Sequence, residues 1–364
     1  MKIAVISNAA PKTNKSPLTS LCKLLEILPI EADVSFYSID YSLNDFSNID
    51  RKVEYHILSR KTKSFLNYKE KQKKLIKILI KEGADIALFW LADKMLFMLN
   101  ECKKHKIKTV FWIYGNVNNK GTLKGVIADF LKKQMIYSAD YIAVESPSVI
   151  EQYSYKIRRR CKKIITLPIF SNNNEFKNII NYQNRQNNIL VVSRISPEKN
   201  INNIIDAFYR FNIEHEKKWN LIIIGDGPDK EKICTKIALL ENIRFLGWQN
   251  HDIICRQLNN SKLFIIASSA EGLPSTLQEA MLCGTPVLAT KISGMKDIIV
   301  DNYNGWFLKG ITANDIYNGL TIFDSFSNKN EISMNAIETI KKNYSKNECK
   351  LKMYNFICNS LNIK

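Results

Sequence analysis

The chain has 364 residues, of which 45% are hydrophobic and 24% charged, a composition that predicts a globular protein with room for two domains. Its eight cysteines form no C-x-x-C pair and its four histidines show no metal-ligand spacing, so we expect reduced thiols in the cytosol and neither a disulfide framework nor a zinc site. The longest apolar stretch, residues 86–99, is interrupted by Asp93 and Lys94 and is too short for a membrane span. The net charge of +18 points to an anionic partner.

From the N-terminus onward, short apolar runs alternate with helical patterns. The first run, residues 3–6, reads as a buried strand and not as a signal peptide, because no small-residue cleavage site follows a long apolar core. Further strands are predicted over residues 33–37, 86–89, 109–113, 141–144 and 164–166, with helices over 19–28, 69–81 and 125–138. This alternation is typical of parallel α/β units.

A polar stretch at residues 171–175, which continues to residue 188, predicts a linker region. The alternation then restarts, with strands over 189–192, 221–224, 243–245, 263–267 and 286–289 and a helix over 201–211. Two doubly wound units joined by a linker predict a ligand site in the cleft between them, at the carboxyl ends of their strands.

Two cations follow the first strand of the second unit. Arg194 comes directly after the strand, Pro197 bends the loop, and Lys199 stands where the next helix begins. An arginine fork and a lysine point charge on one loop can neutralise a diphosphate. The alternative is an ordinary loop between strand and helix that carries surface charges.

A glycine-rich turn, Gly225-Asp226-Gly227-Pro228, follows the next strand. Its glycines allow unusual backbone conformations and let a ligand approach closely. It lacks the Gly-Lys-Ser/Thr ending of a Walker loop and the third glycine of a dinucleotide fingerprint. By itself this turn indicates little.

Two glutamates, Glu271 and Glu279, bracket a turn that follows a further strand. Gly272 and Pro274 mark the turn, and Ser275 or Thr276 is expected to cap a helix that carries Glu279. The free N–H groups at the start of that helix would face an anion, with one carboxylate before the turn and one inside the helix. This arrangement suits a ligand with a central phosphate and hydroxyl-rich ends, such as a nucleotide sugar.

Taken in order, the motifs of the second half resemble those of the retaining glycosyltransferases of family 4, also called glycosyl transferases group 1. The matching segments are S-R-x-x-P-E-K-N, G-D-G-P, F-L-G-W and E-G-L-P-x-x-x-x-E-A, followed by G-T-P-V and N-G-W. The resemblance implies the α/β class with GT-B architecture, in which two Rossmann-like doubly wound domains face each other across a cleft. It places an acceptor domain at residues 1–170, with a crossover helix at about 346–364, and a donor domain at residues 171–345.

The resemblance also implies roles for individual residues. Arg194 and Lys199 match the pair that binds the donor diphosphate, and Glu271 matches the glutamate that holds hydroxyls of the donor sugar. Glu279 matches the glutamate that takes the ribose hydroxyls. Catalysis would rest on Arg194, Lys199 and Glu271. The remaining donor-binding positions are Gly247 and Gln249 near the nucleobase and Gly272, Leu273, Pro274, Ser275, Thr276 and Leu277 around sugar and phosphate.

The first half departs from the family pattern. Residues 8–14 contain no glycine where the family has a glycine pair. Tyr114 occupies the place of a histidine near the transferred sugar, and Asn116 follows it on the acceptor or sugar side. A tyrosine hydroxyl can bond a sugar hydroxyl but is a poor base at neutral pH. Packing of Tyr114 against the cleft wall is the alternative.

The net charge is concentrated in the first half, where residues 1–170 hold 30 Lys and Arg against 16 Asp and Glu. This excess of +14 favours an anionic membrane surface, although charge runs are often no more than solvated helix faces. The favoured function is a retaining, metal-independent transfer from a nucleotide-diphosphate sugar, with UDP preferred, to a glycan or undecaprenyl-linked acceptor in bacterial surface polysaccharide synthesis. The protein is expected in the cytoplasm on the inner membrane face, with no cofactor, no metal and no nucleic acid.

Three other functions fit parts of the pattern. A paired-carboxylate hydrolase would use two glutamates but leaves Arg194 and Lys199 without a role. A non-catalytic membrane or nucleic-acid binder on the same fold would not bind a nucleotide sugar. A nucleotide-sugar epimerase would turn over its donor without an acceptor.

Overall fold

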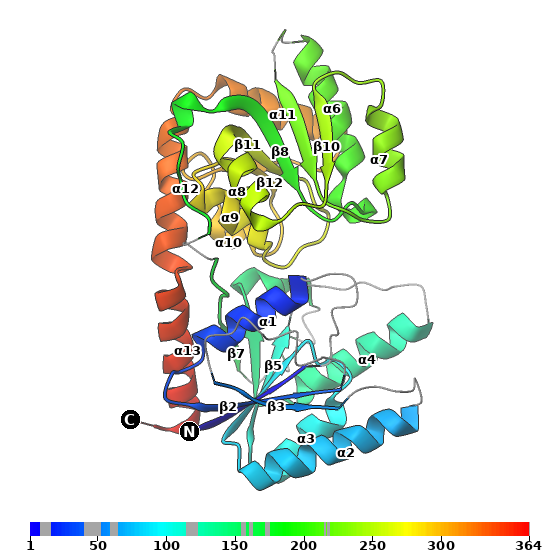
Figure 1. The fold of residues 1–364 in the computed structure, drawn as a ribbon, viewed down its shortest axis with the longest axis vertical. Helices are drawn as coiled ribbons and strands as arrows, with labels where there is room; N and C mark the ends of the chain where they lie inside the picture. The colour runs from blue at the N-terminus through cyan, green and yellow to red at the C-terminus, as the bar shows by residue number, and fades with distance from the viewer. Residues whose placement is uncertain are drawn as a thin grey trace. The chain divides into compact units, whose positions relative to one another are not determined.

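The computed structural model describes residues 1–7, 16–39, 52–58, 65–113, 123–153, 158–159, 163–171, 175–214, 216 and 219–363. The chain divides into two compact units. Unit 1 comprises Met1–Phe170 and Lys346–Lys364, and unit 2 comprises Ser171–Ser345. Each unit is a parallel sheet with helices on both faces, which confirms the predicted α/β class of two Rossmann-like doubly wound units (Figure 1).

Unit 1 is built on a seven-stranded parallel sheet with the order β3-β2-β1-β4-β5-β6-β7. Its strands are β1 (Lys2–Ile6), β2 (Asp33–Ser38), β3 (Glu54–Ile57), β4 (Ile86–Trp90), β5 (Lys108–Ile113), β6 (Tyr141–Val144) and β7 (Ile164–Thr166). The edge strand β3 was missing from the sequence prediction. Its residues Glu-Tyr-His-Ile are only partly buried, so it lacks the continuous apolar run of an inner parallel strand.

Helices cover both faces of this sheet (Figure 1). One face packs against α2 (Phe65–Glu82), α3 (Leu96–Lys104) and α4 (Leu123–Ser138), and the other against α1 (Ser16–Ile27) and α13 (Lys346–Leu361). In α2, Leu75, Ile76 and Leu79 are spaced to form one apolar stripe, and all three are buried in this core. The last helix of the chain, α13, therefore completes unit 1.

Unit 2 is built on a six-stranded parallel sheet with the order β10-β9-β8-β11-β12-β13. Its strands are β8 (Gln186–Val192), β9 (Asn220–Ile224), β10 (Ile243–Gly247), β11 (Ser261–Ile266), β12 (Val287–Thr290) and β13 (Trp306–Leu308). From β8 the chain adds β9 and then β10 on one side of the sheet, and from β11 it adds β12 and then β13 on the other side. The order therefore reverses between these two central strands, which is where doubly wound sheets bind ligands.

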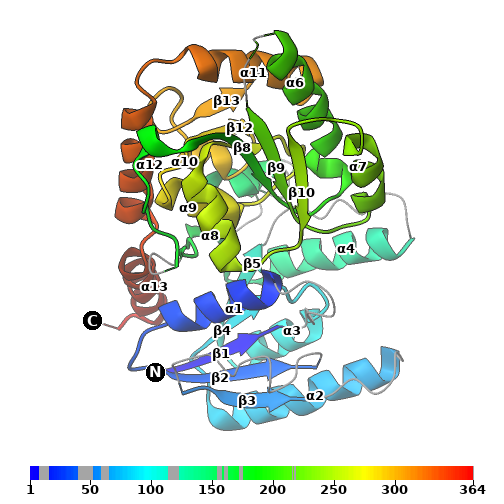
Figure 2. The ribbon, with the colours of Figure 1, turned by 45° about the horizontal axis from the view of Figure 1, so that its top comes forward.

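The helices of unit 2 also form two layers (Figure 2). One layer contains α6 (Ile201–Glu214), α7 (Lys230–Ile237) and α11 (Ala313–Ser325), and the other contains α8 (His251–Asn260), α9 (Ser275–Leu282), α10 (Met295–Ile298) and α12 (Lys329–Asn343). Short 3-10 turns at Pro147–Gln152, Tyr182–Asn184 and Pro197–Lys199 complete the described elements.

The stretch predicted as a linker up to residue 188 belongs instead to the body of unit 2, as far as it is described. Arg185 is only 4% exposed, and its guanidinium donates to Cys283 O at 2.6 Å, Thr285 Oγ1 at 3.1 Å and Ser261 O at 3.3 Å. Burial lowers the pKa of Arg185 to about 10. A polar composition was misleading here because a fully hydrogen-bonded arginine can lie inside a fold.

Among the described residues, no helix has the length and apolar character needed to cross a bilayer.

Candidate active site

Two loops meet where the strand order of unit 2 reverses. Because β8 and β11 pair in parallel, the loop at residues 193–200 and the loop at residues 267–274 leave the same edge of the sheet. The amide of Ser269 donates to Glu198 O at 2.8 Å, and Asn200 Nδ2 donates to Ala267 O at 2.7 Å. Asn200 has a left-handed backbone with φ of 53°, a conformation that asparagine tolerates. These bonds hold the two loops together.

Lys199 and Glu271 form an ion pair across the two loops, between Lys199 Nζ and Glu271 Oε1. Their side chains are 14% and 15% exposed, so solvent screens the pair less than it would a surface pair. Ser268 Oγ donates to the same carboxylate oxygen at 2.9 Å, and Thr290 Oγ1 donates to Ser268 O at 2.8 Å. The structure thus brings together two predicted site residues that lie 72 positions apart.

Arg194 and Glu198 complete the charge pattern of the first loop. Burial would raise the pKa of Glu198, but the Ser196 hydroxyl at 2.6 Å, a backbone hydrogen bond and the charges of Lys199 and Arg194 outweigh it and lower that pKa. Glu198 is therefore ionised at neutral pH and lies within reach of both cations. The side chain of Arg194 is exposed, which leaves its guanidinium accessible to a ligand.

The second loop leads into α9, whose start differs from the sequence prediction. Pro274, not Ser275 or Thr276, is the N-cap, with φ of −69° and ψ of 127°, and it makes no side-chain cap bond. The predicted cap was wrong because the fixed φ of proline suits the entry to a helix and places Ser275 in its first turn. The early N–H groups of α9 therefore lack a hydroxyl cap from this N-cap residue.

Not every predicted donor-binding residue exposes its side chain. Leu273 and Leu277 pack in the core of unit 2 at 7% and 0% exposure, so only their backbone could meet a ligand. Gly272 O accepts the amide of Gly294 at 3.1 Å, which fixes the turn. Glu279 lies in the second turn of α9 and is 4% exposed.

Gly247 and Gln249 lie at the end of the edge strand β10. Gly247 has a φ of +68°, and Gln249 Nε2 donates to Leu246 O at 2.6 Å. Between them, Trp248 is 66% exposed, so a large aromatic face is accessible at the position predicted to seat a nucleobase. The Gly247 carbonyl accepts the Gly225 amide at 2.8 Å, which links this turn to the end of β9.

The glycine-rich turn after β9 packs against protein. A Cβ on Gly225, whose φ is +147°, would lie 1.8 Å from Ser193 O, and a Cβ on Gly227 would lie 2.2 Å from Ile195 O. These glycines therefore let the turn press against the loop that carries Arg194 and Lys199. The sequence suggested that a ligand approaches these glycines, but in the structure the loop at residues 193–200 lies against them.

Tyr114, Asn116 and the glycine-free loop at residues 8–14 lie outside the described residues. Sequence reasoning missed Ser268, Ser269, Asn200 and Thr290, which support the ion pair and join the loops. Position was the available signal, since Ser268 and Ser269 closely follow β11, Thr290 ends β12, and Asn200 ends the motif that begins at Ser193. One described group of His and Glu side chains has the proximity of metal ligands, namely Glu54, His56 and Glu82, and it belongs to unit 1.

Comparison with known proteins identifies the class. Residues 172–342 match the family model described as glycosyl transferases group 1. HepE of Anabaena in complex with UDP has the same fold, with a TM-score of 0.78 and 15% identity over 99% of this chain and 100% of that one. The fold is that of the GT-B glycosyltransferases, and unit 2 is similar in sequence to glycosyl transferases group 1 over the residues given above.

Individual relatives agree with this assignment. An uncharacterized glycosyltransferase of Methanocaldococcus jannaschii is 27% identical over 54% of this chain and 55% of its own length, so the alignment spans about half of that relative. A second from the same organism is 22% identical over 95% of both chains. The lipopolysaccharide 1,6-galactosyltransferase of Salmonella typhimurium is 32% identical over 32% of this chain and 33% of its own.

Proposed function

We propose that the protein transfers a sugar from a nucleotide-diphosphate sugar, with UDP as the favoured nucleotide, to a glycan or lipid-linked acceptor with retention of configuration. The observation that carries the proposal is the Lys199–Glu271 ion pair at the point where the strand order of unit 2 reverses. A cation and a hydroxyl-binding carboxylate are held side by side on two joined loops. A diphosphate linked to a sugar needs both kinds of group.

In the proposed mechanism, Lys199 and Arg194 stabilise negative charge as it grows on the leaving diphosphate. The start of α9 adds backbone N–H groups to this stabilisation. Glu271 binds hydroxyls of the donor sugar and is not the nucleophile. Glu279 takes the ribose hydroxyls and Trp248 offers its face near the base. The leaving phosphate takes the acceptor proton, so the reaction needs neither a protein base nor a metal.

We assign donor binding to unit 2 and acceptor binding to unit 1. The lipopolysaccharide galactosyltransferase among the relatives supports an acceptor from bacterial surface polysaccharide synthesis. The basic charge of unit 1 supports work at an anionic membrane surface, where a pyrophosphate-linked undecaprenyl acceptor would reside. Tyr114 and Asn116 remain proposed contacts on the acceptor or sugar side.

Calorimetric titration with UDP-, GDP- and ADP-sugars tests donor binding directly. We expect saturable binding of one nucleotide class, weakened in Lys199→Ala and unchanged in Lys341→Ala, which removes an exposed lysine of α12. NMR of the product's anomeric centre then tests retention. An absence of binding to every nucleotide sugar would favour the non-catalytic binder. Conversion of the bound donor without an acceptor would favour the epimerase.

A further inference from the structure

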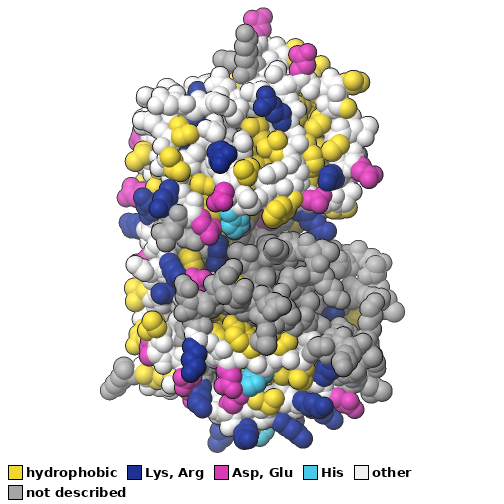
Figure 3. Space-filling model, viewed as in Figure 1, with side chains coloured by type: hydrophobic (Ala, Val, Ile, Leu, Met, Phe, Trp, Pro, Cys, Tyr) yellow, Lys and Arg dark blue, Asp and Glu magenta, His cyan; other side chains and the backbone are white. Residues whose placement is uncertain are grey.

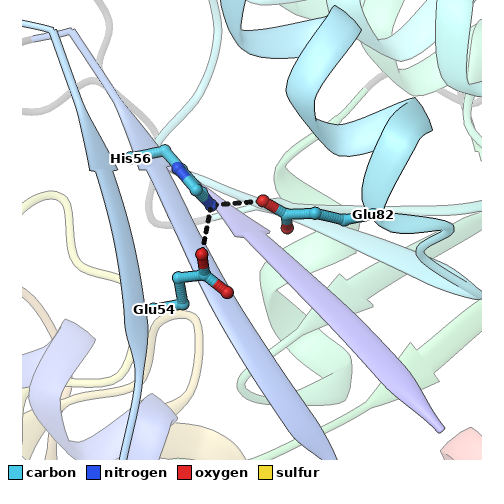
Figure 4. A group of neighbouring side chains, drawn as sticks. All are labelled: Glu54, His56 and Glu82. Carbon is cyan, nitrogen blue, oxygen red and sulfur yellow. Dashed lines mark ion pairs between the residues drawn. The ribbon is translucent and has the colours of Figure 1, made fainter.

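A second group of chemically active side chains lies in unit 1, at the amino-terminal side of its sheet. Glu54 and His56 alternate along β3 and so project on the same face, where Glu82 reaches them from the last turn of α2 (Figure 4). One ligand atom from each residue lies within 4.8 Å of the other two. Three metal-binding groups thus converge from two elements that are far apart in sequence.

The imidazole of His56 faces both carboxylates, and its Nε2 atom contacts them as ion pairs without hydrogen-bond geometry. Its Nε2 lies 2.5 Å from Glu82 Oε1 and 3.7 Å from Glu54 Oε1. Nε2 is nevertheless buried and has no hydrogen-bond partner within the described part of the chain. Because its contacts with Glu82 and Glu54 are ion pairs without hydrogen-bond geometry, a cation held between nitrogen and oxygens would give Nε2 a direct ligand bond.

The surroundings hold two of the three groups in place. The Tyr37 hydroxyl donates to Glu82 Oε2, which leaves Oε1 facing His56. The Tyr37 ring also stacks on the imidazole, with centroids 4.9 Å apart. Such outer contacts orient the ligands of protein metal sites.

We propose that Glu54, His56 and Glu82 bind a divalent transition-metal ion of the zinc class. One imidazole and two carboxylates suit zinc, whereas magnesium and calcium prefer oxygen ligands alone. Two carboxylates balance the charge of a divalent ion. With ligand distances of about 2.0–2.2 Å, two ligands of a tetrahedral ion lie about 3.4 Å apart, so binding would widen the His56–Glu82 contact from 2.5 Å and leave the His56–Glu54 spacing of 3.7 Å nearly as it is.

The bound ion would have a structural role. β3 is the edge strand of the sheet, and in the described residues it pairs only with β2. A metal that joins Glu54 and His56 to Glu82 ties this edge to the end of α2. The expectation that no metal takes part in sugar transfer concerns unit 2 and is independent of this site.

Zinc analysis of the full-length protein without a histidine tag tests the proposal. After loading with Zn²⁺ and dialysis, we expect one zinc per chain and a higher melting temperature than that of the EDTA-treated protein. Glu54→Gln is the informative variant, because the Glu54 side chain is 68% exposed and its loss should not disturb folding. It should weaken zinc binding by about tenfold or more, and His56→Ala should abolish it.

His105→Ala is the matched control, since His105 is exposed at the end of α3 and should bind zinc no differently from the parent. Cobalt substitution provides a second readout, which should show nitrogen and oxygen ligands without a thiolate charge-transfer band. Equal zinc affinity in the parent, Glu54→Gln and His56→Ala would overturn the proposal. So would a parent protein that retains no zinc.

Discussion

At the scale of single residues, the candidate site depends on how one carboxylate is held. Glu271 Oε1 receives both Lys199 Nζ and the Ser268 hydroxyl, so its orientation is fixed before any ligand arrives. Ser268 is in turn held through its carbonyl by Thr290. A carboxylate with two donors on one oxygen keeps its other oxygen in a defined direction, as a sugar-binding group requires.

Ser268→Ala should lower kcat/KM for sugar transfer by about tenfold, or roughly 1.4 kcal/mol, because it removes a hydrogen bond to a charged group. Steady-state kinetics with the preferred donor would measure this change. Ser269→Ala is the matched control, since its hydroxyl makes a long hydrogen bond of 3.3 Å to Glu198 O and its backbone link to the same oxygen remains. Equal losses in both variants would show that Ser268 has no special role in positioning Glu271.

A second prediction at this scale concerns Glu145, which follows β6 in unit 1 and is 7% exposed. Burial raises its pKa to about 8, and the charge of Lys23 offsets this only in part. Between about pH 4.5 and 8 the unfolded chain loses this proton while the folded chain keeps it. The free energy of unfolding should therefore fall as the pH rises, by at most about 1.4 kcal/mol per pH unit from this group.

Glu145→Gln should remove that fall and gain stability over the parent as the pH rises from 6 to 8. Urea unfolding at several pH values would measure the difference. Parallel stability curves for parent and variant would contradict a protonated Glu145 in the folded protein.

At the scale of elements, the sequence predicted the inner strands and the edge strands β7 and β10, but it missed the edge strands β3 and β13. β4 and β9 are continuous apolar runs because both faces of a parallel sheet are covered, and such runs are visible in the sequence. β3 and the first residues of β8 are polar. Their place in the sheets depends on tertiary contacts, such as those of Arg185, that no local pattern reveals.

The same limit applies to the site. Arg194, Lys199 and Glu271 could be found because each follows a buried strand in a recognisable motif. That Lys199 and Glu271 touch could not be read from the chain, since the contact depends on β8 and β11 being neighbours. The start of α9 was placed one or two residues late, because proline competes with serine and threonine as the N-cap.

The packing of the glycine-rich turn gives a prediction at the element scale. Gly225→Ala should destabilise unit 2 by roughly 3 kcal/mol or more, since its Cβ would overlap the carbonyl of Ser193. Gly247→Ala is the matched control for stability. Its φ is +68°, but a Cβ there would meet nothing within 4 Å, so it should cost only about 1–2 kcal/mol.

Chemical denaturation of both variants would measure these costs. Equal destabilisation would indicate that backbone strain alone sets the requirement for glycine. In that case the turn would not be pressing on the loop that carries Arg194 and Lys199.

At the scale of the whole molecule, nearly all of the net charge belongs to unit 1. With the final helix included, unit 1 holds 34 Lys and Arg against 17 Asp and Glu, and unit 2 holds 19 against 18. Lys and Arg side chains gather around the end of unit 1 at which α2 lies (Figure 3). Five lysines of α2 are exposed, namely Lys69, Lys73, Lys74, Lys77 and Lys81.

This distribution predicts that the protein sediments with anionic vesicles at low salt and is released as ionic strength rises. Reversing Lys73 and Lys77 to Glu should weaken vesicle binding about tenfold or more, at roughly 1 kcal/mol for each cation lost. Reversing Lys341 and Lys342, which are exposed on α12 of unit 2, should have little effect. If both double variants bound anionic vesicles equally well, the lysines of α2 would be solvent-exposed residues with no part in membrane binding.

The central claim is that the Lys199–Glu271 pair binds and activates a nucleotide-sugar donor. The most direct measurement is the rate of sugar transfer by Lys199→Ala beside Lys341→Ala, with the melting temperature of each. Loss of Lys199 should lower kcat by about a hundredfold or more while the fold persists, and loss of Lys341 should leave the rate unchanged. A Lys199→Ala protein that is folded and transfers sugar at the parent rate would contradict the claim.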